Sequence, residues 1–266
     1  MKRTFQIFVC LITILTVCLI RGSTVFSLSP EEDIVLAKTP DAGLEYQNSL
    51  LFFGESTTAH LISREVLTGG KQTKQVLAGE KGTMLLSPKI TTQSILDPHT
   101  KEKTTIAETV AKTQPAYLVL SFGLNGIVGF AKNPDSYLKS YQKLIDVLQK
   151  ASPKTAIILQ TVYPVTEPND ASCWKFSHAP QEINQMIQQI NTLLPTLASA
   201  NTGVKIADTA SVLRDENGAL KAEFCVGDGI HLSREAYAEI LTYLRTHAYH
   251  IPTPLPITPD QWRTPS

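Results

Sequence analysis

The chain of 266 residues has no excess of charge of either sign, and this absence narrows the range of its partners. Lysine plus arginine equals aspartate plus glutamate at 24 each, so the formal net charge is zero. Without a basic field a chain has little to hold nucleic acid phosphates, and without an acidic field it does not concentrate cations. We therefore expect a small or neutral ligand and no nucleic-acid partner.

The spacing typical of metal ligands is absent as well. None of the six histidines forms an H-x-x-x-H pair, the arrangement that places two ligands on one helix face. A metal cluster would have to gather His60, His178, Asp228 and His231 from distant segments. We expect no metal and no cofactor.

The first residues lack acidic side chains and form one long apolar run. Lys2 and Arg3 precede an uncharged stretch from Phe5 to Ile20, which is typical of an export signal. Residues 1–27 are expected to be a signal peptide or, if uncleaved, an N-terminal membrane anchor through residues 4–20, because about 17 apolar residues span a bilayer. Both interpretations place the remaining chain outside the membrane, extracellular or at the cell surface.

Cysteine is scarce, and the chain after residue 27 contains only Cys173 and Cys225. In an oxidising compartment a disulfide between them is a candidate, because free exposed thiols do not persist there. The bond would close a loop of about fifty residues and contribute roughly 3 to 4 kcal/mol in the chain-entropy model.

No internal repeat and no Gly/Ser-rich linker divides the chain. Five apolar stretches have strand length, and several are apolar on both faces, as in a parallel sheet covered on both sides: residues 50–53, 75–77, 117–122, 156–162 and 204–207. Apolar residues at three-to-four spacing predict helices over 137–148, 183–197 and 236–244. We expect one doubly wound α/β/α domain over residues 31–250 and a proline-rich tail over 251–266.

Three short polar segments fall where such a sheet binds ligands, beyond the carboxyl ends of its strands. They are Gly54-Glu55-Ser56, Gly123-Leu124-Asn125-Gly126 and Asp228-Gly229-Ile230-His231. Each segment alone is typical of a turn or a surface loop. Their joint placement predicts a single site.

These segments carry the groups needed for acyl transfer. The Ser56 hydroxyl requires a base, and His231 is the best-placed histidine. Asp228, three residues earlier, can fix the imidazole tautomer. Asn125 can donate its amide to an oxyanion, an interaction typically worth about 3 to 4 kcal/mol of barrier. The Ser56 N–H, at a helix start, is a second donor.

On these residues the chain resembles the SGNH hydrolase superfamily, also called GDSL-like lipases and acylhydrolases. The resemblance implies a three-layer flavodoxin-like fold with a five-stranded parallel sheet and a Ser/His/Asp hydrolase without a metal. It assigns the nucleophile to Ser56, an oxyanion donor to Asn125, and the acid and base to Asp228 and His231. A further oxyanion N–H is expected from Gly82, with Gly79 as the alternative.

Two positions depart from that family pattern. Glu55 stands where the family usually has aspartate, and Gly126 stands where it commonly has aspartate after the asparagine. Glu55 keeps the charge but adds a methylene, so the hydrogen bonding around the nucleophile turn must differ. Gly126 removes a side chain that often braces this loop. Neither change removes a catalytic group.

Two aromatic residues follow the fourth expected strand. Tyr163 and Trp174 are candidate pocket residues, and Trp174 has a ring suited to stack on a sugar or to line an acyl slot. A strand-ending turn at Tyr163 and an ordinary half-buried tryptophan are equally good interpretations. A disulfide from Cys173 to Cys225 would brace this loop against Asp228.

The function expected from these residues is that of an exported serine esterase. It would remove a small acyl group, most plausibly acetyl, from a carbohydrate or small-molecule ester. One alternative is an O-acetyltransferase that passes the acyl group to an envelope glycan. The other is a non-catalytic surface domain that binds glycans.

Overall fold

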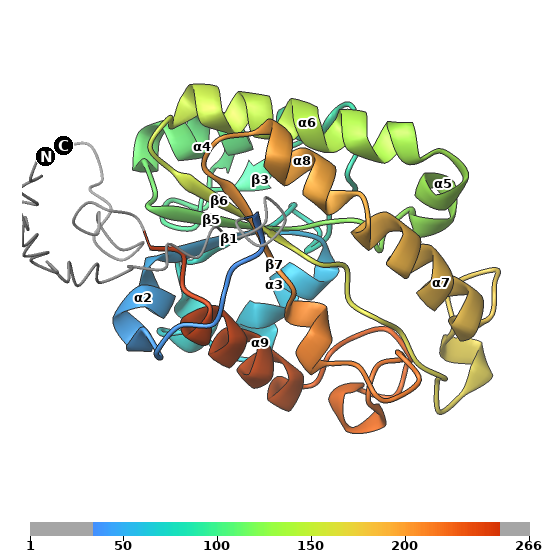
Figure 1. Cartoon of the computed structure of the whole chain (residues 1–266). Coiled ribbons are helices and arrows are strands. Elements are labelled where there is room, and N and C mark those ends of the chain that lie inside the picture. The colour runs from blue at the N-terminus through green and yellow to red at the C-terminus, as the bar shows by residue number, and fades with distance from the viewer. Residues whose placement is uncertain (1–33, 251–266) are drawn as a thin grey trace, which may run out of the picture.

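The computed structural model describes residues 34–250 (Figure 1). Its centre is a five-stranded parallel sheet with strand order β2-β1-β5-β6-β7. The strands are β1 (Leu50–Gly54), β2 (Val76–Leu77), β5 (Tyr117–Ser121), β6 (Ala156–Gln160) and β7 (Val204–Ala207). All five predicted strands are present. The predicted export segment and the proline-rich tail lie outside the described residues.

The register of the strands determines which loops meet. β1 pairs with β5 along its whole length, and Gly54 lies opposite Ser121 at the carboxyl ends. After β2 the chain crosses to the other side of β1, so the strand order reverses between β1 and β5. Ligand sites in open parallel sheets lie at this reversal, and the segments that follow β1 and β5 therefore start side by side.

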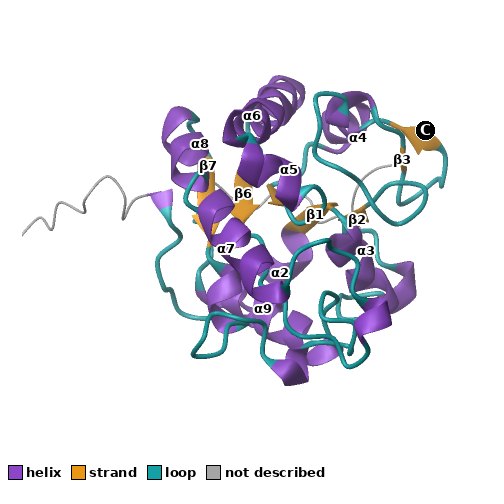
Figure 2. Ribbon diagram, turned by 90° about the vertical axis from the view of Figure 1, so that its right-hand side faces the viewer, coloured by secondary structure: helices purple, strands orange, loops and turns teal. Residues whose placement is uncertain are grey.

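Helices cover both faces of the sheet (Figures 1 and 2). One layer holds α4 (Ile106–Thr113), α5 (Ile127–Lys132), α6 (Pro134–Ala151), α7 (Pro180–Asn191) and α8 (Leu194–Ala200), and the other holds α2 (Gly43–Ser49), α3 (Ser56–Ser63) and α9 (Arg234–Thr246). Alternate strand residues feed different cores: Leu51 and Phe53 join one cluster, while Leu50 and Phe52 join the other. This alternation explains why residues 50–53 of β1 are all apolar.

Helix α9 begins where the sequence predicts, whereas one predicted helix is divided into two in the structure. Ser233 caps α9 as expected, and its Oγ accepts the Ala236 N–H at 3.3 Å. The predicted single helix over 183–197 is instead divided into α7 and α8. Pro195 lies in the first turn of α8 and has no N–H to donate to the preceding turn, so one continuous helix would lose a hydrogen bond there.

Short elements complete the described chain. An antiparallel pair, β3 (Ile95–Leu96) and β4 (Lys103–Thr104), lies beyond β2, and Gly79 forms an isolated bridge with Ile95. The 3₁₀ helices are η1 (Gly70–Gln72), η2 (Ile90–Thr92), η3 (Ala171–Cys173), η4 (Thr209–Val212) and η5 (Ala222–Phe224). Within residues 34–250 no helix is long and apolar enough to cross a bilayer.

Candidate active site

The structure brings Ser56, His231 and Asp228 together beyond the carboxyl ends of the strands. The Ser56 Oγ lies 3.3 Å from the His231 Nε2. On the other side of the ring, the His231 Nδ1 lies 2.6 Å from the Asp228 Oδ2. The hydroxyl, the imidazole and the carboxylate thus form one continuous chain from residues 175 positions apart.

The turn that presents Ser56 depends on a glycine. A Cβ placed on Gly54 would collide with the Thr58 side chain and with the Ser121 carbonyl of the neighbouring strand. Glu55 is extended, at φ −79° and ψ −163°, and α3 begins directly at Ser56. The strand therefore ends in a sharp turn that points the serine out of the sheet.

The Asp228 loop is folded around its own carboxylate. Asp228 Oδ1 accepts the backbone N–H groups of Ile230 at 2.9 Å and His231 at 2.8 Å, while Oδ2 faces the imidazole. Partial burial raises the pKa of Asp228, but the hydrogen bonds from the His231 backbone, the imidazole and Ile230 outweigh burial and hold this pKa below its usual range. An ionised Asp228 favours a proton on Nδ1 and leaves Nε2 free to accept the serine proton.

The predicted disulfide between Cys173 and Cys225 is wrong, because both thiols are free. The Cys225 sulfur faces into its own loop and accepts the N–H groups of Gly227 at 3.4 Å and Gly229 at 3.2 Å. The expected bracing of this loop is made instead by main-chain hydrogen bonds from the loop that follows β6. Thr166 N donates to Gly229 O at 2.9 Å, and Asn169 N donates to Gly227 O at 2.8 Å.

Glu55 has a role that the sequence reasoning missed. Its side chain is 2% exposed, and its two carboxyl oxygens accept the backbone N–H groups of Gly123 and Asn125, each at 2.9 Å. Burial raises the pKa of Glu55 to about 8, against the opposing effect of these backbone donors. The longer glutamate side chain thereby joins the nucleophile turn to the loop that carries Asn125. In the sequence, only the position of Glu55 between Gly54 and Ser56 could have indicated this role.

The predicted oxyanion donors lie beside this brace and have protein acceptors in the structure. Asn125 Nδ2 donates to Thr83 Oγ1 and to Met84 O, both at 3.0 Å. The Gly82 N–H donates to Gly79 O at 2.8 Å within a turn. An oxyanion would have to replace one of these acceptors, and the Thr83 hydroxyl is the easiest to displace because it can rotate away. The donor roles of Gly82 and Asn125 stay predictions.

Gly126, the second departure from the family pattern, fits its backbone. Its φ of 88° lies in the left-handed region, where it precedes α5. An added Cβ would lie 3.2 Å from Leu85 and 3.3 Å from Phe130. The position therefore favours glycine over a residue with a side chain.

His60 lies one turn along α3 from Ser56 and adjoins the proposed base. Its ring centroid is 4.7 Å from that of His231, and its buried Nδ1 has no hydrogen-bond partner among the described residues. Burial, then the neighbouring His231 and Arg64, lowers the pKa of His60. The ring is thus neutral at pH 7. Arg64 Nε donates to Leu232 O at 3.2 Å and ties α3 to the His231 segment.

The two candidate pocket aromatics have different surroundings. Tyr163 is 5% exposed and packs in the core, where burial raises its pKa to about 12. Trp174 is half-buried, donates its indole N–H to His178 O at 2.8 Å, and would lie 3.1 Å from a Cβ placed on Gly229. Trp174 therefore adjoins the Asp228 loop.

The same residues can be tested as metal ligands. Among residues 34–250 no group of three or more histidine, cysteine, aspartate or glutamate side chains is arranged to hold a metal ion. His178 instead pairs with the neighbouring Ser177 hydroxyl at 3.0 Å.

The parallel sheet carries a serine, an imidazole and a carboxyl group in line at its carboxyl edge, an arrangement of side chains that could support acyl transfer. The model of the GDSL-like lipase/acylhydrolase family matches residues 52–239, and the chain belongs to that family. The resemblance found in the sequence is confirmed. A comparison with curated proteins finds no match.

Solved structures match this chain at low sequence identity. A Streptococcus pneumonia protein whose name refers to platelet activating factor is 23% identical, with TM-score 0.55, over 76% of this chain and 84% of that one. A GDSL-like lipase from Bacteroides thetaiotaomicron is 18% identical, with TM-score 0.48, over 77% and 89%. A carbohydrate esterase family 3 protein from Talaromyces cellulolyticus is 16% identical, with TM-score 0.47, over 74% and 93%. The first of these similarities supports the predicted α/β fold.

Proposed function

We propose that this chain is an exported serine esterase that hydrolyses small acyl esters, in particular acetyl esters on a carbohydrate. The observation that carries the proposal is the continuous chain from the Ser56 Oγ through His231 to Asp228, with distances of 3.3 Å and 2.6 Å. Membership of an acylhydrolase family supports ester hydrolysis. The apolar N-terminal segment supports export.

In the proposed reaction, His231 Nε2 removes the Ser56 proton as Oγ attacks the ester carbonyl. The ionised Asp228 stabilises the imidazolium that forms. Collapse of the tetrahedral intermediate breaks the bond to the alcohol, which leaves with the proton from His231, and the acyl group remains on Ser56. Water then attacks this acyl-enzyme with the same proton transfers, which releases the acid and restores the serine.

The oxyanion donors in this proposal are the Ser56 N–H, the Asn125 amide and the Gly82 N–H. The N–H of Ser56 lies at the start of α3, where backbone donors and the helix dipole favour negative charge. The oxyanion would replace Thr83 Oγ1 as the acceptor of the hydrogen bond that Asn125 Nδ2 donates. Each such donor lowers the barrier because charge develops on the carbonyl oxygen only in the transition state.

A carbohydrate as the alcohol is supported by Trp174. Its half-buried ring lies against Gly229 of the loop that carries Asp228 and His231. A flat aromatic face with an apolar body is suited to stack on a sugar ring. In this proposal Trp174 holds the alcohol beside the base that must protonate it.

Hydrolysis of 4-nitrophenyl acetate by the chain without residues 1–27 tests the proposal. Ser56→Ala and His231→Ala should each abolish turnover, while Ser211→Ala, an exposed serine far along the chain, should not change it. Activity that persists in Ser56→Ala would exclude the serine as nucleophile. Product analysis with a glycan acceptor separates hydrolysis from acetyl transfer.

A further inference from the structure

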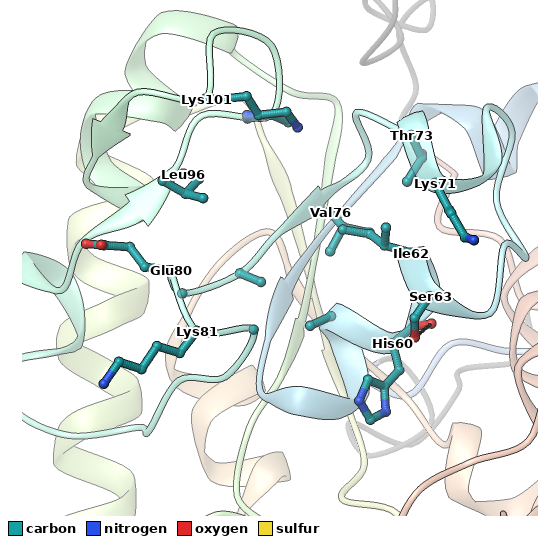
Figure 3. Close-up of a pocket in the computed structure, with 15 residues that line it drawn as sticks. His60, Ile62, Ser63, Lys71, Thr73, Val76, Glu80, Lys81, Leu96 and Lys101 are labelled. Atoms are coloured by element: carbon teal, nitrogen blue, oxygen red, sulfur yellow. Dashed lines mark hydrogen bonds between the residues drawn. The ribbon is translucent and has the colours of Figure 1, made fainter.

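A cavity of about 410 Å³ lies along α3, the helix that begins at the proposed nucleophile (Figure 3). Its α3 wall includes Ala59, His60 and Ser63, which follow Ser56 by three, four and seven residues. Side chains at this spacing share one helix face, so the cavity begins about one turn, roughly 5.4 Å, along the helix from Ser56.

The opposite wall belongs to the loop that carries the predicted oxyanion glycine. Residues 79–82 line the cavity, and β3 and the turn that follows it supply further lining residues. A Cβ on Gly82 would lie 3.9 Å from the Ala59 Cβ, so the two walls come within contact distance of each other at these residues. The volume lies within the range of about 300 to 1,000 Å³ that small-molecule sites occupy.

The cavity lining carries more positive than negative side chains. Lys71, Lys81 and Lys101 lie on different sides of the cavity, and Glu80 is its only carboxylate (Figure 3). Glu80 is paired with Lys103, which lies outside the lining, at 2.8 Å.

Two of the lysines form no ion pair within the described residues, although Lys103 lowers the pKa of the Glu80 carboxyl and Lys81 lies close enough to lower it further. Lys71 is paired with Glu65 at 3.3 Å, whereas Lys81 and Lys101 form no ion pair with any residue in the described range. In a chain whose basic and acidic residues are equal in number at 24 each, a lining with three lysines and one carboxylate produces a local positive potential.

The backbone at Lys101 adds a second observation. Lys101 ends the turn between β3 and β4 with a φ of 64°, a left-handed conformation that is uncommon for a residue other than glycine, asparagine or aspartate. The turn is held by Lys101 N donating to Asp97 O at 2.9 Å. Glycine would fit this backbone with less strain than the lysine that occupies it.

We propose that this cavity binds a negatively charged group of the ester substrate, a carboxylate or a phosphate, through Lys81 and Lys101. The inference rests on the proposed esterase function and names the substrate class: esters that carry an anionic group near the scissile bond. His60, neutral at pH 7, separates the cavity from His231.

The test compares esters that differ only in charge. The native enzyme is assayed with 4-nitrophenyl acetate, with acetyl esters of glucose and of glucuronic acid, and with the 4-nitrophenyl monoester of succinic acid. The glucuronate ester places the charge on the alcohol, and the succinate ester places it on the acyl group. We expect the native enzyme to prefer one of these anionic esters over its neutral counterpart.

Lysine variants assign that preference to the cavity. In the double variant Lys81→Gln/Lys101→Gln, kcat/KM for the preferred anionic ester should fall at least about tenfold, mainly through KM, because a charge-assisted hydrogen bond is lost at each position. Hydrolysis of 4-nitrophenyl acetate should be unchanged. Lys150→Gln removes the same charge from an exposed position on α6, in the layer opposite α3, and should leave the preference intact.

The outcomes separate this inference from the function on which it rests. Turnover of 4-nitrophenyl acetate without any preference for an anionic ester, or with a preference that survives in the double variant, overturns the inference alone. Absence of all ester turnover overturns the proposed function. In that event, calorimetry with glucuronate and with inorganic phosphate decides the inference, since binding lost in the double variant supports it and absence of binding to the native chain overturns it.

Discussion

The two halves of the proposed site are held in different ways. The nucleophile side, residues 54–56 and 123–126, is joined by one buried carboxyl group, that of Glu55, which accepts N–H groups from Gly123 and Asn125. The acid-base loop, residues 225–231, is half exposed and is held by main-chain hydrogen bonds to the loop after β6 and by the Asp228 carboxylate. The nucleophile side should therefore respond to pH and to a single substitution, and the acid-base loop should tolerate changes that spare both Asp228 and His231.

The largest expected effect lies on the acid-base loop. Asp228→Asn keeps an oxygen able to accept the Ile230 and His231 N–H groups but no longer stabilises an imidazolium. We expect kcat for 4-nitrophenyl acetate to fall about 10⁴-fold, as when a triad aspartate becomes asparagine, with little change in the free energy of unfolding. Asp146→Asn, at an exposed position of α6, serves as the control. A fall of less than tenfold would show that Asp228 does not orient the base.

The next effect tests the chemistry of the nucleophile side. Asn125→Ala removes the amide that now donates to Thr83 and Met84. If this amide turns to the oxyanion during the reaction, kcat should fall by about 10² to 10³ while KM changes little. Steady-state kinetics with Asn217→Ala, at an exposed position, as the matched control measures the difference. A change confined to protein stability would assign Asn125 a structural role only.

Glu55 makes the stability of the nucleophile side depend on pH. Burial raises its pKa from the ordinary 4.5 to about 8 in the folded chain, so between these values the folded chain keeps a proton that the unfolded chain has released. Rising pH therefore favours unfolding. We expect the free energy of unfolding to fall by about 3 kcal/mol between pH 5 and pH 8 in the native chain, relative to Glu55→Gln.

Urea denaturation of both proteins at several pH values measures this slope. The comparison of slopes cancels the contribution of the other carboxyl groups to the pH dependence, because these groups are present in both proteins. It also removes the constant cost of placing the glutamine amide next to a backbone N–H group. Parallel slopes for the two proteins would show that Glu55 titrates near its ordinary value.

The smallest effect concerns the two thiols, that of Cys173 in the loop after β6 and that of Cys225 in the acid-base loop. Since Cys173 and Cys225 are not bonded, Cys173→Ser should change the free energy of unfolding by no more than about 0.5 kcal/mol, as a substitution outside the core does. A reducing agent should leave the melting temperature unchanged. A loss of about 3 kcal/mol under reducing conditions would instead reveal a disulfide.

The positions of the strands and of the main site residues could be predicted from the sequence. Ser56 and Asn125 follow apolar strands, and His231 lies just before the Ser233 cap of α9, so local signals place all three at one edge of the sheet. The brace by Glu55 could not be predicted, because it depends on the register that sets Gly54 opposite Ser121. The direction of the Cys225 sulfur likewise depends on the turn at Gly227 and Gly229, which no periodicity reports.

Two further features, the short strands β3 and β4 and the division between α7 and α8, had weak signals in the sequence. The β3 and β4 strands have two residues each, too few to show an alternating pattern, yet their turn carries Lys101 to the cavity. The division between α7 and α8 was overlooked because the apolar spacing continues across Pro195. Only the missing N–H of that proline marks the break.

The short edge strand β2 has a consequence for association between molecules. It contributes two residues, Val76 and Leu77, to its side of the sheet, and the opposite edge at β7 is flanked by the segment at Val35, where Leu36 N donates to Ile206 O at 2.8 Å. Neither border offers a long row of unpaired peptide groups to a second sheet. A protein built this way can reach high local concentration without joining its neighbours strand to strand.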